Sequence, residues 1–257
     1  INDVADGIQT ARSDADKSIA DQVTRLNDTL KNVETLNIRI TAANARNADV
    51  SALQDQRSVL IDEISEMVPV RTVDRDHGTV ALYTTGGAVL LDGRAAEVGF
   101  EPSNVITPYM SIDDGSLSGL TINGYSINTS STSGRLHGGT LGAQFEIRDE
   151  LAPEAQNQID AMARDLIERF EDPAVDPTLA AGDPGLFTDS GAAFDPTLDV
   201  GLASRLTLNT LVDPAQSGES WRLRDGLGAT TPGAEGDATL LNALSDALTD
   251  PRAQTTD

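Results

Sequence analysis

The amino-acid sequence predicts an α+β protein in which a small antiparallel β domain is inserted into an elongated helical rod or bundle domain. Two observations predict this fold class. Apolar residues recur at helical spacing toward both ends of the chain, and between them the pattern changes to the short alternating runs that are typical of strands. The predicted organisation is a first helical part at 1–68, the β domain at 69–137, and a second helical part at 138–257 that contains a loop-rich segment at 172–236.

One long helix is predicted at about 8–45. A helix of this length spans about 55 Å at ~1.5 Å per residue, which favours an elongated domain. Asn37 stands where an apolar residue is expected, and two interpretations are open: it sets register or partner number, or it faces solvent near a bend. The residues that recur at alternating spacings of three and four, as in a coiled coil, are Val23, Leu26, Leu30, Val33, Asn37 and Ile40.

A second helix follows a polar turn at 44–49 and ends before Pro69. The short turn predicts that the two helices form an antiparallel helical hairpin. The apolar positions that mark the second helix are Leu53, Leu60, Ile61, Ile64 and Met67.

Short antiparallel strands are predicted after Pro69. Turn signals at His77-Gly78, Gly86-Gly87 and Asp92-Gly93 separate alternating apolar residues, and Asn123-Gly124 predicts a tight turn between the last two strands. The segments that carry the strand pattern lie around Val70, Val73, Val80, Leu82, 89–91, Val98, 106–112, 120–122 and 125–127.

A third helix is predicted from about Thr140 to Phe170, with Pro153 kinking or interrupting it. The segment 172–236 is rich in Gly, Pro, Asp and Thr, which predicts loops and a short hairpin with order at 205–211 and 221–223. Trp221, the only Trp, is either a surface anchor or a half-buried strand residue. A last helix is predicted at 238–248, with an apolar face of Leu240, Leu241, Leu244 and Leu248.

The composition argues against several classes of partner. Asp and Glu outnumber Lys and Arg by 41 to 18, for a formal net charge of -23. Because phosphate groups and anionic lipids require a basic surface, we predict no nucleic-acid and no membrane partner. Cysteine is absent and aromatic residues are only 4% of the chain, which leaves no thiolate site and few anchors for small molecules.

The residues that carry chemistry form no recognisable site. His77 and His137 are predicted to lie in loops without companion ligands, and 74–78 lacks the third acidic ligand and the terminal Glu of a calcium loop. Asp183 and Asp189 suit the acid and base of a glycosidase, but an acidic composition produces such pairs without function. We therefore predict no enzyme activity, no cofactor, and no catalytic, cofactor-binding or metal-binding residue.

Two segments resemble the flagellar hook-associated protein 1 family, the hook-filament junction proteins. The first, 36–70, is similar to the helical hairpin of that family, although Ala52 stands where an acidic or polar residue is commoner. The second, 138–166, is similar to its "GG-x-L" helix with a following "RD". Weaker likenesses lie at 182–189 and 236–244. The matching residues are Leu36, Asn37, Ile40, Leu53, Asp55, Gln56, Arg57, Leu60, Ile64, Gly138, Gly139, Leu141, Arg148, Asp149, Gln158, Ile159, Asp160 and Ala163.

The resemblance implies a structural protein of the bacterial flagellum that joins hook and filament and serves motility. It implies a core fragment without the two terminal assembly regions, which we expect to be a monomer in solution. For the whole protein it implies export by the flagellar type III machinery with a chaperone, an extracellular location, a ring of copies, and contacts with the hook protein and the adjacent hook-associated junction protein. Alternatives are another axial flagellar or extracellular assembly protein, flagellin-like or hook-like, or an extracellular carbohydrate-active enzyme.

Overall fold

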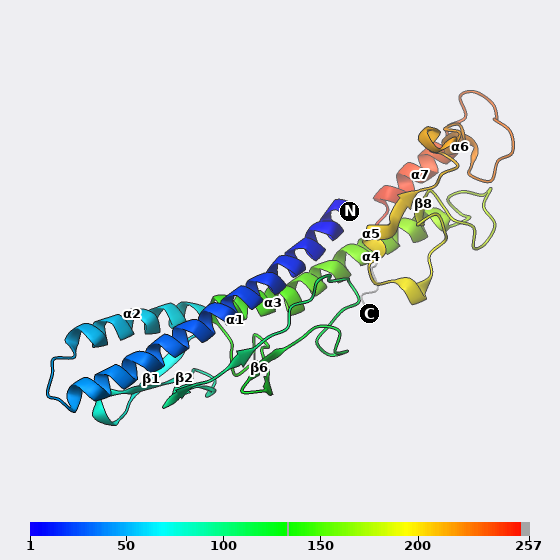
Figure 1. Ribbon diagram of the computed structural model, residues 1–257. Helices are drawn as coiled ribbons and strands as arrows, with labels where there is room; N and C mark the ends of the chain where they lie inside the picture. Colours follow the sequence, from blue (N-terminus) through cyan, green and yellow to red (C-terminus); the bar gives the residue numbers. More distant parts are fainter. Residues whose placement is uncertain (133, 253–257) are drawn as a thin grey trace. The chain divides into compact units, whose positions relative to one another are not determined.

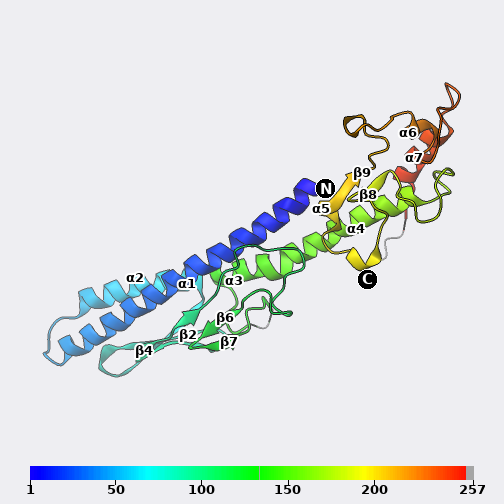
Figure 2. The same ribbon diagram turned by 45° about the vertical axis from the view of Figure 1, so that its right-hand side comes forward.

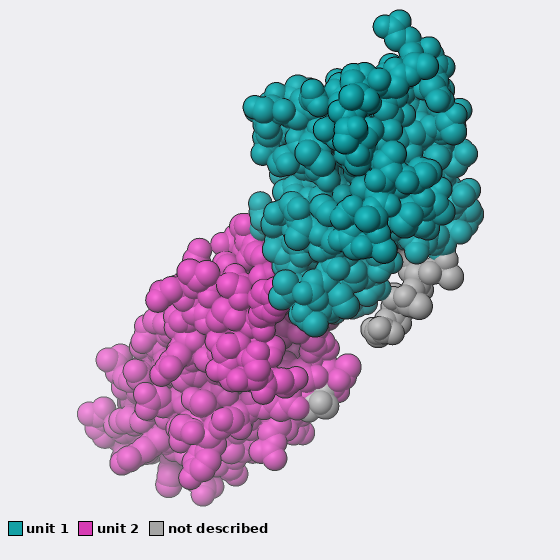
Figure 3. Space-filling view, turned by 90° about the vertical axis from the view of Figure 1, so that its right-hand side faces the viewer, with its two compact units in different colours: residues 1–8, 154–257 teal, residues 9–153 magenta. Residues whose placement is uncertain are grey.

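A computed structural model describes residues 1–132 and 134–252 of the chain (Figure 1). The chain divides into two compact units, unit 1 with residues 1–8 and 154–257 and unit 2 with residues 9–153 (Figure 3). These units do not follow the predicted boundaries at 69 and 137, because the strands share a core with the helices before and after them. The predicted division of the sequence into helical, β and helical domains stays a prediction.

Two long helices begin the chain and lie side by side (Figure 1). They are α1 (Asn2–Asn44) and α2 (Ser51–Met67), so α1 begins earlier than predicted. Each of the six seam positions from Val23 to Ile40 is buried, as the spacing predicts. Asn37 is also buried, and the interpretation that it faces solvent is therefore wrong.

The strands form two small antiparallel sheets in unit 2. The order follows the sequence in both sheets, and Asn123 and Gly124 close the last turn with φ of 50° and 80°, as their turn signal predicts. One sheet contains β1 (Val70–Asp74), β2 (Val80–Thr84), β3 (Val89–Asp92) and β4 (Arg94–Ala95), and η1 (Asp76–Gly78) joins its first two strands. The other contains β5 (Val98–Gly99), β6 (Leu120–Ile122) and β7 (Tyr125–Ile127).

The strand predicted at 106–112 is wrong, because this segment forms turns and irregular backbone. Its carbonyl groups at Thr107 and Met110 accept hydrogen bonds from the side chain of Arg12 and not from a neighbouring strand. The apolar residues of the segment therefore mimic a strand pattern without a sheet partner.

The third helix is interrupted just before Pro153. Its parts are α3 (Gly139–Glu146), the π-helical turn η2 (Ile147–Leu151) and α4 (Ala152–Glu171). The N–H of Ala152 donates to the carbonyl of Ile147, five residues earlier. Because proline has no N–H and cannot continue the usual ladder, a widened turn next to Pro153 is the local adjustment.

A single apolar cluster joins the elements of unit 2. Leu26 and Leu30 of α1 pack in it with Ile64 of α2, Leu82 of β2 and Phe145 of α3. Figure 2 shows both small sheets beside α1. The helices and the sheets of unit 2 thus share one core.

Unit 1 is built around α4. Its strands β8 (Phe187–Asp189) and β9 (Leu206–Leu208) pair in an antiparallel manner. The second strand lies in the segment 205–211 where order is predicted, but its partner at 187–189 is not predicted. The strand interpretation of Trp221 is wrong, because the half-buried Trp221 has helical φ and ψ and precedes a short helix. The remaining elements are η3 (Pro196–Leu198), α5 (Leu202–Arg205), η4 (Pro214–Gln216), α6 (Arg222–Asp225) and α7 (Thr239–Thr249).

No helix within the described ranges combines the length and the apolar character that crossing a bilayer requires.

Candidate functional site

The contacts of the two histidines are with neighbouring side-chain and backbone groups. The carbonyl of His77, in the turn η1, accepts a hydrogen bond from the side chain of Asn44, and His137 Nδ1 lies 2.6 Å from the carbonyl oxygen of Gly134. Neither lies in a ligand set, since residues 1–132 and 134–252 contain no group of three or more His, Asp or Glu that is placed to hold a metal ion.

The two candidate acid-base carboxylates are engaged with neighbouring groups. Asp189 is buried and forms a bidentate ion pair with Arg205, at 2.8 Å and 3.0 Å. Asp183 accepts a hydrogen bond from the backbone N–H of Ala180 in its own loop. A carboxylate whose two oxygens both accept hydrogen bonds from one guanidinium is already fully engaged in an ion pair. These contacts favour structural roles for both residues.

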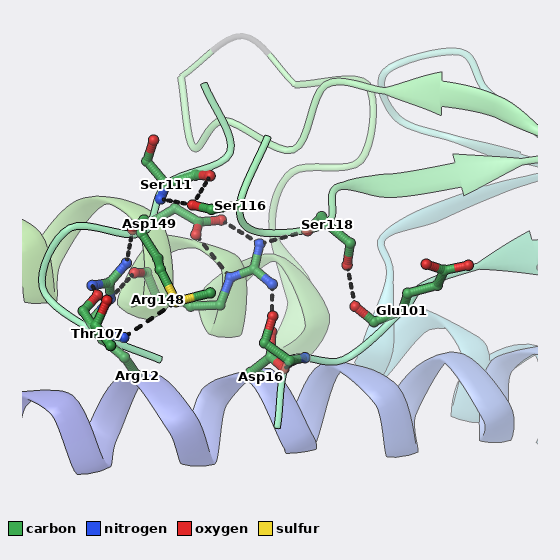
Figure 4. Close-up of polar contacts among 11 residues, drawn as sticks. Arg12, Asp16, Glu101, Thr107, Ser111, Ser116, Ser118, Arg148 and Asp149 are labelled. Atoms are coloured by element: carbon green, nitrogen blue, oxygen red, sulfur yellow. Dashed lines mark hydrogen bonds and ion pairs between the residues drawn. The ribbon is translucent and has the colours of Figure 1, made fainter. Parts of the chain in front are cut away.

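A buried charge cluster in unit 2 is the most elaborate polar site (Figure 4). Its centre is Arg148 on the π-helical turn, whose side chain is fully buried. Arg148 donates to Asp16 of α1 at 2.6 Å and to both carboxylate oxygens of Asp149 at 2.8 Å and 3.0 Å. Its guanidinium also lies over the rings of Phe100 and Phe145, 5.4 Å and 5.1 Å from their centroids.

Arg12 and Asp16 fasten the irregular segment 101–118 to α1. Arg12 donates from Nη1 to the carbonyl of Thr107 at 3.0 Å and from Nη2 to that of Met110 at 2.6 Å. The second oxygen of Asp16 accepts from the N–H of Ser103 at 2.7 Å. Backbone groups that find no strand partner are thus satisfied by charged side chains from α1.

Arg148 completes the attachment of this segment. It donates to the carbonyl of Ser118 at 2.9 Å, and its own carbonyl accepts from Arg12 Nε at 3.0 Å. The cluster therefore joins three segments that are distant in sequence: α1, the loop that ends near Ser118, and the turn η2.

The protonation chemistry of the cluster reflects its burial. Desolvation is the main cause that lowers the pKa of Arg12, with the charge of Asp149 opposing it and that of Arg148 adding to it. Desolvation also raises the pKa of Asp149, against the hydrogen bonds and charge of Arg148. Because both oxygens of Asp16 and of Asp149 already accept hydrogen bonds, the arrangement is suited to fixing backbone and not to proton transfer.

A cavity of about 610 Å³ borders the cluster. Three of the four charged side chains that line it are already bonded: Arg12 to backbone carbonyls, Asp149 to Arg148, and Glu150 to the N–H and hydroxyl of Ser131. The fourth, Asp113, is exposed to solvent. The cavity is therefore not a strong candidate for a cofactor or charged ligand.

A second polar cluster ties the first sheet to the helical hairpin. Asn37 donates to the carbonyl of Val80 at 2.8 Å and accepts from the N–H of Val80 at 3.2 Å. Arg57 of α2 donates to the side-chain oxygen of Asn37 at 2.8 Å and to the carbonyl of Gly78 at 2.7 Å. Asn37 thus fixes the start of β2 on α1 and α2, an intramolecular form of the register role that its seam position suggests.

Close packing explains the paired glycines before α3. Gly139 has φ of +66°, and a Cβ atom there would lie 2.3 Å from the carbonyl oxygen of Met67. A side chain at this position would therefore collide with the end of α2 in a backbone conformation that L-residues rarely adopt. Glycine lets the two helix ends approach.

Asp160 performs a similar fastening role in unit 1. Its carboxylate accepts hydrogen bonds from the N–H groups of Gly201 and Ala203, both at 2.7 Å, at the start of α5. Ala163 and Ile167 lie on the same helix and pack in the apolar cluster that contains Leu202 and Ala203 of α5. One face of α4 thus holds α5 by polar and apolar contacts together.

Glu171 makes the stability of unit 1 depend on pH. Burial raises the pKa of Glu171 above its ordinary value of 4.5, opposed by a hydrogen bond from the N–H of Phe194. Between the ordinary value and the raised one, the folded state binds more protons than the unfolded state, so this residue's contribution to stability falls as pH rises through that interval. Glu171→Gln keeps an oxygen acceptor and carries no charge to bury.

We expect Glu171→Gln to gain stability relative to the parent chain between pH 4.5 and pH 7. Urea unfolding followed by the fluorescence of Trp221, the only Trp of the chain, reports on unit 1. Asp246→Asn is a matched control, because Asp246 is exposed and its substitution removes one negative charge that is not buried. Equal pH profiles for the two variants would contradict the assignment.

Sequence reasoning did not identify Arg12 and Asp16, although a signal was present. The apolar seam, continued from Val23 by steps of four, three and four, reaches Ile19, Asp16 and Arg12. Charged residues on the buried face of a helix require partners, which is the sign of a buried ion cluster. By contrast, the sequence singles out Asn37, with a register role, and also Arg57, Gly139, Arg148 and Asp160, but it does not show which groups these residues contact.

These contacts define a class of protein, a helix-rich scaffold in which buried polar side chains fasten short strands and loops to long helices. The family model of the flagellar hook-associated protein FlgK helical domain matches residues 1–185. The chain belongs to this family.

A solved structure supports the fold assignment. The flagellar hook junction protein FlgK from Burkholderia pseudomallei is similar with a TM-score of 0.56 and 21% sequence identity, over 74% of this chain. The similar region is 34% of the Burkholderia chain, so this chain spans about a third of that protein's length. The predicted class, α+β with strands inserted between helices, is confirmed. A comparison with curated proteins found no match.

Proposed function

We propose that this chain is the core of a structural protein that joins the hook and the filament of a bacterial flagellum, and that it is not an enzyme. The observation that carries the proposal is the match of the FlgK helical-domain family over residues 1–185. The charge cluster of unit 2 supports it, because Arg12, Asp16 and Arg148 use their charges to hold backbone in place, and Asp149 pairs with Arg148.

The proposal extends to the partners and location of the whole protein. Its partners are further copies of itself in a ring, the flagellar hook protein, the adjacent hook-associated junction protein, and the type III export machinery with a chaperone. Its location is extracellular, in the flagellum. The net charge of -23 supports this set, since such a surface disfavours nucleic acid and anionic membranes.

Deletion of the gene tests the proposal. We expect deletion cells to assemble hooks without filaments, to release flagellin into the medium, and to lose swimming. Electron microscopy of the cell surface and an immunoblot of the medium for flagellin measure the first two effects, and a plasmid copy of the gene should restore all three. Deletion cells that carry normal filaments and swim normally would overturn the junction role.

A further inference from the structure

A shallow groove of about 470 Å³ runs along the helical hairpin of unit 2. Asn32, Thr35 and Arg39 line it on α1, and Gln56, Val59 and Leu60 line it on α2. Spacings of three and four place each set on one helix face. The groove is thus bordered by two facing stripes of side chains, the geometry in which helical segments dock.

The groove offers an apolar surface beside a cation. Val59 is 67% exposed, whereas Ile64 and Met67 of the same helix are buried. Arg39 is exposed and takes part in none of the ion pairs found among the described residues. At one end of the groove, Arg25 already pairs with Glu63 at 2.5 Å. An occupant therefore needs apolar side chains and a carboxylate that can reach Arg39.

The charge of the hairpin differs from that of the rest of the chain. Residues 25–67, from Arg25 to the end of α2, contain five Lys or Arg and seven Asp or Glu, whereas unit 1 contains six Lys or Arg and 21 Asp or Glu. The acidic unit 1 of another copy is therefore repelled less by the hairpin than by a second acidic unit 1, and the exposed Arg39 offers its carboxylates a cation.

Helix α7 of unit 1 has the matching chemistry. Its Leu241 and Leu248 are 45% and 57% exposed and lie seven residues apart, on one helix face. The exposed Asp246 lies between them in sequence. We propose that α7 of a second copy of this chain docks in the α1–α2 groove, with its leucines on Val59 and Leu60 and a carboxylate near Arg39.

Such a contact joins two different surfaces and is therefore head-to-tail, the type that generates rings or open chains of copies. This inference rests on the proposed function, because the small groove provides a weak contact that the ring at the junction would reinforce. In solution at low concentration the chain is then expected to be largely monomeric.

Disulfide trapping tests the inference, since the natural chain contains no cysteine. A Val59→Cys variant is mixed with a Leu241→Cys variant and oxidised, and the mixed dimer is measured by non-reducing electrophoresis and mass spectrometry. The control pair is Val73→Cys with Leu241→Cys, because Val73 is also an exposed valine and lies on β1, outside the groove. We expect at least about fivefold more mixed dimer from the groove pair, and less at high salt.

The arginine supplies a second measurement. Arg39→Glu in the Val59→Cys chain should reduce the mixed dimer to the level of the control pair, whereas Arg39→Lys should retain most of it. All the substituted residues are exposed, and circular dichroism confirms that each variant folds. Equal trapping for the groove and control pairs, or no effect of Arg39→Glu, would overturn the inference.

The two proposals fail in different ways. If deletion cells lose filaments but trapping is unspecific, only the docking of α7 is wrong. If deletion cells swim normally, the junction role is wrong whatever the trapping yields.

Discussion

Replacement of Arg148 by methionine is expected to lower the free energy of unfolding of unit 2 by about 3–5 kcal/mol. The substitution keeps much of the apolar stem but leaves the buried Asp16 without its 2.6 Å ion pair and the carbonyl of Ser118 without its donor. An uncompensated buried charge is costly because it has lost both water and its partner. The substitution also removes the contacts of the guanidinium with the rings of Phe100 and Phe145.

Urea unfolding followed by amide hydrogen exchange in α1 measures this loss in unit 2. Arg25→Met is the matched control, because Arg25 pairs with Glu63 near the surface and such pairs contribute about 1 kcal/mol or less. The double variant Asp16→Leu with Arg148→Met should recover part of the loss, since it removes the unpaired charge. If Arg148→Met costs no more than Arg25→Met, the cluster does not stabilise the fold as argued.

Gly139→Ala is expected to cost about 3 kcal/mol in unit 2. The left-handed φ of +66° contributes roughly 1–2 kcal/mol for any residue with a Cβ. The 2.3 Å approach to the carbonyl oxygen of Met67 adds roughly 1–3 kcal/mol, because backbone on both sides must shift. Both costs arise at the same residue, the first of α3, and are therefore expected in the same variant.

Gly87→Ala separates the two costs of the Gly139 substitution. Gly87 has φ of +85°, but a Cβ atom there would meet no other atom within 4 Å. Its loss, measured by the same unfolding experiment, should therefore equal the conformational cost alone, about 1–2 kcal/mol. Equal losses at Gly87 and Gly139 would show that the contact with α2 is not limiting.

The long elements were predictable because their signals are local. The seam from Val23 to Ile40 predicts the buried face of α1, and Pro69 predicts where α2 ends. The Asn123-Gly124 pair predicts the turn between β6 and β7, since both residues tolerate positive φ. In each case the signal lies within the element or directly beside it.

The errors arose where distant side chains decide the local backbone. The segment 106–112 has apolar residues at strand spacing, but Arg12, far away in sequence, satisfies the carbonyls of Thr107 and Met110. The strand interpretation of Trp221, one of two that the sequence leaves open, rests on three alternating positions, which are too few to distinguish a strand from a single helical turn. Asn37 could not be placed because its partners, Arg57 and Val80, lie elsewhere in the chain.

Because α1 is one continuous helix in unit 2, insertions and deletions within it are restricted. Arg12 and Asp16 serve the charge cluster, and Asn37 serves the first sheet, all from one uninterrupted helix. Insertion of one residue between Asp16 and Asn37 would rotate one set of contacts by about 100° relative to the other, whereas seven residues would rotate it by only about 20°. Related sequences should therefore tolerate insertions in loops such as 229–236 far more readily than between these two anchor points.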